Sequence, residues 1–391
     1  MVVQLFDLQR LRSYRGRRAI FYGLLLLGTF APLPAAPAPK PMRAIFLAPA
    51  ESKENPFWKS VDEHMRAAAQ SLGIQFSFIV AKPWVGDRGN QVRQLLSGPD
   101  RPDFFITTAH MGVGTSELEI AEQAGVKTFM IDAGLLEKDL KRVGGPRQTF
   151  RLWIGQMIPS GEKAGHDEAQ ALLEGARART TARPIEILAL GGCETDLTAI
   201  ERAEGLRRAV AEAKDAVLKQ IITCNWDPEQ ARNKVPLMVK RYPGVAAVWS
   251  ANDAMALGAM TALRAQGKVP GKDVLVGGID WDPACIEAVG RGEMEVDVGG
   301  HFLDGAWALV LLYDYHQGVD FADEALQWHT SMLPVTRKNL ATLGKYFHNR
   351  NLDRIDFKAF SRKCHPEQKR HRFTWDAFLE QHARSFREAS P

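Results

Sequence analysis

Hydrophobic and polar positions follow two alternating patterns along most of this chain of 391 residues. Short apolar runs are typical of buried strands, and longer stretches with an apolar residue at every third or fourth position are typical of helices. The strand-like runs cover residues 44–48, 76–80, 103–107, 127–131, 151–154, 185–190, 217–223, 245–249, 274–279 and 294–298. Helical patterns lie between them, for example over residues 58–72, 197–213 and 253–266. This alternation indicates β–α–β units in a mainly parallel sheet.

Ten strands exceed what one sheet of this kind usually holds, so we predict an α/β fold with two doubly wound parallel-sheet lobes. The N-terminal lobe is expected over residues 42–155 plus 300–330. The C-terminal lobe is expected over residues 156–299 plus 331–338. Residues 339–391 have helical patterns with scattered aromatic residues, and we expect them to form a helical tail packed on a lobe.

The first 38 residues differ from the rest of the chain. Five arginines and one aspartate precede or flank an apolar run over residues 19–31, and a tract rich in proline and alanine follows. This order is typical of an export signal, and the run is shorter than the roughly 20 residues of a membrane-spanning helix. We therefore predict a signal peptide over residues 1–38 and a periplasmic location. An uncleaved anchor or a wrongly assigned start is the alternative.

The positive charge of the chain comes from this first segment. Removing five arginines and one aspartate takes away a net +4, which equals the formal charge of the whole chain. A nucleic-acid-binding protein would keep a basic patch in its folded part, and none stands out before residue 338. The basic cluster over residues 362–372 is expected to be a solvated helix end. We therefore expect no nucleic-acid partner.

The cysteines and the short motifs give no sign of catalysis. The four cysteines lack the spacing of a metal site; they are Cys193, Cys224, Cys285 and Cys364. Cys193 and Cys224 each end a predicted strand, so they are either a disulfide in an oxidising compartment or small buried side chains. The phosphate-binding, dinucleotide-binding, zinc-protease and serine-hydrolase motifs are missing from the sequence. We expect no enzymatic activity, no metal and no cofactor.

Polar residues follow the predicted strands where an open α/β sheet binds its ligand. Asn252 and Asp253 follow one buried strand, and Asp280 follows the next. Because such sheets bind ligands outside the carboxyl ends of their strands, these side chains could hydrogen-bond a small polar molecule. The sequence NPFW at residues 55–58 adds an aromatic wall after the first strand. The pattern favours a binding protein.

Five segments together resemble the type I periplasmic binding proteins, especially the ribose- and galactose-binding group and the related autoinducer-binding receptors. They are NPFW at 55–58, FMIDAG at 129–134, AIERAEGL at 199–206, WSANDAMALGA at 249–259 and GGID at 277–280. The resemblance covers about residues 44–335. It implies two lobes joined by a three-strand hinge, with a ligand held between them and closure of the lobes around it.

The resemblance also implies a set of ligand contacts. Aromatic rings would cover the apolar face of a sugar from both sides, and carboxylates and amides would hydrogen-bond its hydroxyls. The rings are Phe57, Trp58 and Trp226, and the polar contacts are Asn55, Asp132, Asn252 and Asp280. Core packing is the alternative for Phe57 and Trp58. Helix N-capping is the alternative for Asp132 and for Asp253, where we expect the cap.

Three contacts of the ribose-binding proteins have no counterpart, since the resemblance aligns them with Ala133, Ile200 and Gly300. These differences argue against ribose itself. Other side chains would then compensate, and the candidates are Glu194, Thr195, Arg202, Trp281 and His301.

The resemblance thus implies an exported, monomeric solute-binding protein that captures a sugar or a sugar-like polyol. It would deliver the ligand to the membrane permease of an ATP-driven importer. Presentation of the bound state to a membrane sensor kinase is the alternative. A repressor's effector domain shares this fold, but a repressor would need a helix-turn-helix before the first strand, and residues 1–38 do not have that pattern.

Overall fold

The computed structural model describes residues 40–50, 55–348 and 350–387. Residues 41–391 form one compact unit, and the fold described below is the fold of that unit. The predicted signal peptide, residues 1–38, lies outside the described residues. The described helices include none with the length and apolarity needed to cross a membrane.

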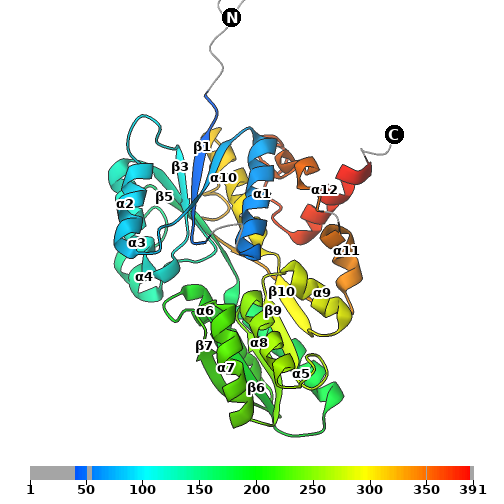
Figure 1. The fold of residues 1–391 in the computed structure, drawn as a ribbon. Helices are drawn as coiled ribbons and strands as arrows, with labels where there is room; N and C mark the ends of the chain where they lie inside the picture. Colours follow the sequence, from blue (N-terminus) through cyan, green and yellow to red (C-terminus); the bar gives the residue numbers. More distant parts are fainter. Residues whose placement is uncertain (1–39, 51–54, 349, 388–391) are drawn as a thin grey trace, which may run out of the picture. The chain divides into compact units, whose positions relative to one another are not determined.

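Two six-stranded sheets form the centre of the fold (Figure 1). The strands of the first sheet are all parallel, in the order β11-β5-β4-β3-β1-β2. They are β1 (Arg43–Ala48), β2 (Gln75–Val80), β3 (Phe104–Thr107), β4 (Lys127–Ile131), β5 (Trp153–Pro159) and β11 (Gln327–Thr330). We call this sheet and its helices the N-terminal lobe.

The second sheet has the order β12-β10-β9-β8-β6-β7, and only β12 runs antiparallel to its neighbour. Its strands are β6 (Ile185–Gly191), β7 (Ala216–Thr223), β8 (Val245–Ser250), β9 (Leu275–Ile279), β10 (Val296–Gly299) and β12 (Leu333–Val335). We call this sheet and its helices the C-terminal lobe. The predicted α/β fold with two doubly wound lobes is confirmed.

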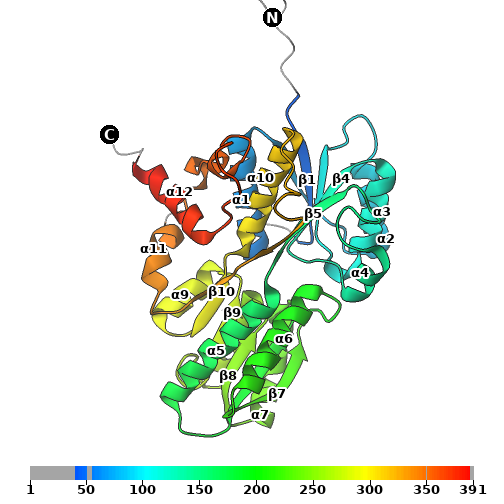
Figure 2. The same cartoon turned by 180° about the vertical axis from the view of Figure 1, so that it is seen from behind.

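Helices cover both faces of each sheet (Figures 1 and 2). The N-terminal lobe has α1 (Pro56–Leu72), α2 (Val85–Leu95), the 3-10 turn η1 (His110–Gly112), α3 (Gly114–Ala124), α4 (Glu137–Val143) and α10 (Asp304–His316). The C-terminal lobe has α5 (Gly161–Arg179), α6 (Leu197–Glu212), α7 (Pro228–Arg241), α8 (Asp253–Ala265) and α9 (Pro283–Arg291). The turn η2 (His301–Leu303) joins β10 to α10.

The side chains of β3 show why these strands are apolar along their whole length. Phe104 and Ile106 belong to the core that includes α1, whereas Phe105 packs with residues of α2 and α3 on the opposite face. Successive strand residues point to opposite faces, and both faces are covered. Such strands therefore appear in the sequence as continuous apolar runs.

The chain passes between the lobes at three places: from β5 to α5, from β10 to η2 and from β11 to β12. The strand β5 continues to Pro159 and pairs there with β11. Residues 156–159, which we had assigned to the C-terminal lobe, thus belong to the first sheet. The apolar pattern resumes after Gln156, and the sequence prediction ended the strand too early at that polar position.

The tail contains α11 (Leu340–His348), the turns η3 (Leu352–Arg354) and η4 (Phe357–Phe360), and α12 (Trp375–Arg387). It starts beside α9, where Leu340 packs near Gly290, and its turns η3 and η4 pack against α1 and α10 (Figures 1 and 2). The ring of Phe347 lies 5.3 Å from that of Trp281 in the C-terminal lobe. The hydroxyl of Tyr346 lies 2.9 Å from His64 Nε2 in α1. The tail therefore links the two lobes a fourth time.

Candidate ligand-binding site

A cavity of about 510 Å³ lies between the two lobes, a size typical of small-molecule sites. Its wall is formed by residues that follow β1, β3, β4, β6, β7, β8, β9 and β10. They are Pro49, Ala50, Asn55, Phe57, Trp58, His110, Asp132, Cys193, Asp196, Thr198, Arg202, Asn225, Trp226, Asn252, Asp280 and His301. These positions lie at the carboxyl ends of the strands, as expected for an open α/β sheet.

The cavity brings together most of the residues singled out from the sequence. Those that line it are Asn55, Phe57, Trp58, Asp132, Trp226, Asn252, Asp280, His301 and the weaker candidate Arg202. Glu194 and Trp281 do not line it.

The N-terminal lobe supplies two rings at the start of α1. Asn55 Oδ1 accepts a hydrogen bond from the backbone N–H of Trp58 at 3.1 Å, and Pro56 occupies the first helical turn. This N-cap starts the helix and fixes the two rings that follow. Phe57 stacks on the imidazole of His301 at 4.6 Å between ring centroids, and Trp58 lies edge-on to His110 at 6.0 Å.

Trp226 forms the aromatic part of the opposite wall. Its indole N–H donates to Asp196 Oδ2 at 3.0 Å, and the guanidinium of Arg202 lies 5.8 Å from its ring centroid. Gly192 lies directly against the ring. Asn225 and Trp226 both have positive φ, at 52° and 65°, a conformation that costs energy in non-glycine residues.

Backbone strain of this kind gathers at the cavity. The described residues other than glycine with positive φ include Asp132 at 65° and Asp280 at 143°, in addition to the pair at Asn225 and Trp226. All four line the cavity. Such conformations persist where the surrounding structure holds the residue, and they are frequent at binding sites. Arg147, Trp281 and Asn351 also have positive φ and lie outside the cavity wall.

An imidazole lies between two carboxylates at this site. His110 Nε2 lies 3.0 Å from Asp132 Oδ2, and His110 Nδ1 lies 3.0 Å from Asp196 Oδ2. Burial lowers the pKa of His110, but the hydrogen bonds and charges of the two carboxylates outweigh it and raise the pKa to about 9. Burial also raises the pKa of Asp132, yet the bond from His110 outweighs it, so that this pKa lies below its usual range.

A second polar group surrounds Arg202. This guanidinium donates to the carbonyl oxygen of Ala251 at 2.6 Å and to His301 Nε2 at 3.1 Å, and it lies 3.5 Å from Asp280 Oδ1. Burial and the charge of Arg202 lower the pKa of His301 to about 3, so His301 is neutral and accepts this bond. Burial raises the pKa of Asp280 well above its usual range, although Arg202 opposes the shift.

Asn252 has two roles. Its Oδ1 accepts from the backbone N–H of Met255 at 3.0 Å and caps α8, while its side chain also lines the cavity. We had expected Asp253 to be this cap. The helix begins at Asp253, so the capping position falls one residue earlier. Asp253 Oδ2 instead accepts from the backbone N–H of Asp282 at 2.7 Å.

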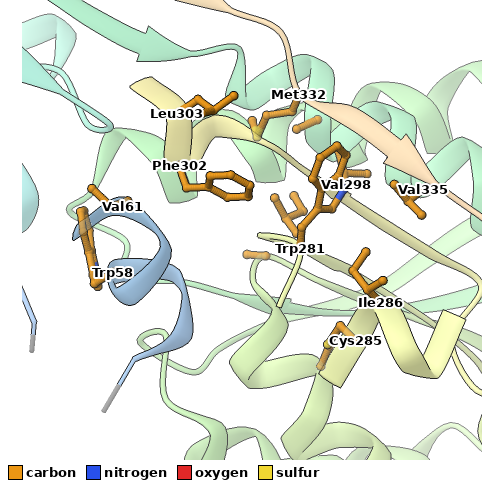
Figure 3. Close-up of a cluster of buried hydrophobic side chains, with 14 of the residues drawn as sticks. Trp58, Val61, Trp281, Cys285, Ile286, Val298, Phe302, Leu303, Met332 and Val335 are labelled. Atoms are coloured by element: carbon orange, nitrogen blue, oxygen red, sulfur yellow. The ribbon is translucent and has the colours of Figure 1, made fainter. Parts of the chain in front are cut away.

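Trp281 belongs to the core and not to the cavity wall, which corrects our expectation. Its indole N–H donates to the carbonyl oxygens of Asp297 and Leu333 at 3.1 and 3.2 Å. Figure 3 shows its ring near Val298, among buried apolar side chains. Trp281 directly follows Asp280, whose side chain faces the cavity, and the side chain of Trp281 points away from the cavity.

Glu194 is also misplaced by the sequence prediction. Its exposed side chain accepts a hydrogen bond from the hydroxyl of Thr223 and lies outside the cavity wall, and the neighbouring Thr195 is exposed as well. Cys193 and Cys224, for which a disulfide was one of two interpretations, are both free thiols. Cys193 lines the cavity, whereas Cys224 is buried.

The arginine that the resemblance placed at Ile200 is not lost. The side chain of Ile200 is exposed to solvent, and Arg202 on the same helix lies in the cavity. This helix thus supplies an arginine to the cavity wall, at a position other than the one that the resemblance aligned, and the exposed Ile200 no longer argues against ribose.

Sequence reasoning missed several wall residues, above all His110 and Asp196. Both could have been found with the rule that located Asp280. His110 follows β3, and Asp196 precedes the helix after β6, so both lie at carboxyl ends of parallel strands.

A group of buried side chains has ligand atoms spaced closely enough for a metal ion. These atoms, from Asp253, Cys285 and Asp297, all lie within 4.8 Å of one another. Burial raises the pKa of both carboxyls and of the thiol well above their usual ranges. Each of the three already has a partner in the core: Asp253 and Asp297 accept from the backbone N–H groups of Asp282 and Trp281, and the thiol of Cys285 lies 3.9 Å from the carbonyl oxygen of Asp253. We therefore assign this group to the core.

The chain matches the family described as periplasmic binding protein domain over residues 45–318. It is 34% identical to the ribose import binding protein of Salmonella typhimurium over 244 residues, 62% of this chain and 75% of that protein. It is 26% identical to a D-apiose import binding protein of Actinobacillus succinogenes over 246 residues, 62% of this chain and 71% of that protein.

A solved structure gives the same picture. The periplasmic sugar-binding protein from Pseudomonas fluorescens superposes with a TM-score of 0.77 at 31% identity, covering 86% of this chain and 99% of that one. Proteins of this family bind substrates and do not transform them. The fold, the cavity between the lobes and the family match together show that this chain belongs to the type I periplasmic binding proteins.

Proposed function

We propose that this protein captures a small uncharged sugar or sugar-like polyol between its lobes and delivers it to the permease of an ATP-driven importer. One observation carries the proposal. Aromatic rings from both lobes and polar side chains from the ends of both sheets line a single cavity of about 510 Å³. Flat rings suit the apolar C–H face of a sugar, and the polar groups suit its hydroxyls.

The charges of the cavity wall support an uncharged ligand. The cations are His110 and Arg202, and two carboxylates, Asp132 and Asp196, balance them. The net charge of the cavity wall is zero when the remaining carboxyl, Asp280, is protonated and −1 when it is ionised. No positive charge is in excess, so a sugar phosphate or a sugar acid would bring a buried charge without a partner.

The two-lobe architecture supports capture by closure. A ligand that contacts both lobes favours the closed arrangement by its differential affinity for that arrangement. Phe57 and Trp58 are on one lobe, and Trp226, Asn252 and Asp280 are on the other. Closure therefore completes the set of contacts.

The names of the relatives support import. Two of the proteins described above are named as import binding proteins and the third as a periplasmic sugar-binding protein. None of the three is named for a sensory role. The proposed periplasmic location agrees with the export signal predicted over residues 1–38.

A binding screen with matched variants tests the capture proposal. Isothermal calorimetry would compare uncharged aldoses and polyols, starting with D-ribose and D-apiose, with the corresponding phosphates and sugar acids. We expect Trp226→Ala to weaken binding of the sugar that binds wild type by about 30-fold or more, since loss of such a central ring costs about 2 kcal/mol or more. The control is Trp84→Ala, because Trp84 is 75% exposed and lies outside the cavity wall.

Tighter binding of an anionic sugar, or equal affinities of wild type and Trp226→Ala, would contradict the proposal. The thiol of Cys193 gives a second readout, because a ligand in the cavity should slow its alkylation. Uptake of the labelled sugar by cells lacking this protein tests the import step. Normal uptake combined with a lost response to the sugar would favour the sensory alternative.

A further inference from the structure

The ring of His110 connects the two lobes across the cavity. It comes from η1 in the N-terminal lobe and bonds to Asp132 of the same lobe. Its other nitrogen bonds to Asp196, the residue that precedes α6 in the C-terminal lobe. A second contact joins the lobes nearby, where the hydroxyl of Thr198 donates to the carbonyl oxygen of Asp132 at 3.5 Å.

The partners of the ring define its protonation. An ionised carboxylate only accepts hydrogen bonds. Asp196 Oδ2 accepts from His110 Nδ1 and from the indole of Trp226, both at 3.0 Å. Asp132 Oδ2 accepts from the other ring nitrogen. With both carboxylates ionised, both ring nitrogens donate, and the ring that fits this position is an imidazolium.

We infer that His110 is a positioning residue for ligand capture: as an imidazolium it joins the lobes and holds Asp132 and, through Asp196, the Trp226 ring against the ligand. The inference rests on the proposed function. In this role His110 makes no contact with the permease, and it affects sugar selection only through the placement of these two side chains.

The surroundings of the ring give this bridge a pH dependence. The titratable groups facing it are Asp132 and Asp196, with Arg202, Asp280 and His301 on the rest of the cavity wall. The neighbouring carboxylates raise the pKa of His110 to about 9 against the burial that lowers it. When the lobes separate, Asp196 moves away with its lobe while Asp132 stays beside the ring, so the pKa of His110 falls below its value in the closed form.

The sign of the effect follows from this difference. A group whose pKa is higher in the closed form favours that form at low pH. The contribution is complete below the pKa of the open form and is lost as the pH rises to about 9. Ligand affinity should therefore fall as the pH rises from the lower pKa of the open form to about 9, by at most about tenfold per pH unit, and binding in this window should take up a proton.

The first test needs no ligand. Wild-type mature protein, labelled at its histidines, is titrated by NMR from pH 5 to 10, and solution X-ray scattering follows the lobe separation over the same range. We expect one histidine, missing from the spectrum of His110→Gln, to titrate well above 6.5, and the molecule to expand as it deprotonates. Ordinary titration of His110 together with dimensions independent of pH would overturn the inference.

The second test measures affinity for the sugar that binds in the screen, in buffers of different ionisation enthalpy. The glutamine side chain in His110→Gln is uncharged and does not titrate, so the dependence of affinity on pH should vanish in this variant. Asp196→Asn should reduce it. The control His166→Gln changes a surface imidazole 2.9 Å from Glu212 and should keep the wild-type slope.

A wild-type slope in His110→Gln would overturn the inference while leaving sugar capture intact. If no sugar binds wild type, the proposed function fails, and the ligand-free titration still decides the role of His110.

Discussion

At the scale of single residues, the position of Trp226 depends on a glycine that touches no ligand. A Cβ atom added at Gly192 would lie 2.3 Å from the ring carbon Cζ2 of Trp226. The ring is also held by Asp196 and Arg202, so it cannot move aside without breaking polar contacts. Gly192 thus fixes the ring plane that faces the ligand.

Gly192→Ala should therefore weaken sugar binding by about fivefold or more, because overpacking of this kind costs about 1–3 kcal/mol. Calorimetry with the sugar that binds wild type measures the loss. Gly86→Ala is the matched control, since a Cβ there would contact nothing within 4 Å. Equal affinities of the two variants would show that Gly192 does not position the ring.

Single site residues could be predicted from the sequence where a polar residue follows an apolar strand. Asp280 and Asn252 follow apolar strands, so the carboxyl-end rule located them from the sequence. The same rule did not distinguish Asp280 from Trp281, because consecutive residues of a turn point in different directions. His110 was overlooked because it lies in no motif of the resemblance, although its position after β3 satisfies the rule.

At the scale of elements, the tail is held on α10 by a buried polar network. Asp314 accepts hydrogen bonds from the backbone N–H groups of Arg362 and Lys363 and from the hydroxyl of Ser361. His371 Nε2 lies 2.9 Å from Asp314 Oδ2, and His371 Nδ1 lies 2.6 Å from Glu324. The basic segment 362–372 is thus an anchor of the tail and not the solvated helix end that we predicted.

Asp314→Ala should lower the free energy of unfolding by about 3–5 kcal/mol, because it leaves buried donors without a partner. Thermal denaturation measures the loss, and limited proteolysis should cut first within the tail. Asp323→Ala provides a control on the same segment: Asp323 pairs with Arg362 at 58% side-chain exposure and should cost at most about 1 kcal/mol. A similar loss in both variants would contradict a buried anchor.

The elements themselves were largely predictable, since every predicted strand is present. Apolar periodicity defines elements whose faces are covered on both sides, as in β3. The helical pattern of the tail predicts its helices but not the path of the chain between them. Its path is set by contacts distant in sequence, such as the one between Asp314 and His371, which no local pattern reveals.

At the scale of the whole molecule, the tail connects lobes that three strand crossings already join. Phe347 packs on Trp281 of the C-terminal lobe, and Tyr346, the preceding residue, bonds to His64 of the N-terminal lobe. Trp281 directly follows Asp280 of the cavity wall, and His64 lies in the helix that presents Trp58. The tail therefore contacts both elements that hold the ligand.

Phe347→Ala should widen the lobe separation in the ligand-free protein and weaken sugar binding by about 2- to 12-fold, the equivalent of one aromatic pair at about 0.5–1.5 kcal/mol. Distances between spin labels on the two lobes measure the separation. Phe373→Ala removes ring contacts with Trp307 and Trp328 of the N-terminal lobe and with His371 of the tail, none of them in the C-terminal lobe, so it should leave the separation unchanged. Equal separations in wild type and Phe347→Ala would rule out this role.

A hinge with such a tether has a bounded range of motion. A hinge that opens freely samples many wide arrangements, and each capture event must give up that freedom. A tether that excludes the widest arrangements reduces the entropy lost on capture, as preorganisation does in other binders. The tail would then set the affinity of the pocket from outside it, so that its length and sequence could tune sugar retention without any change in the residues that touch the sugar.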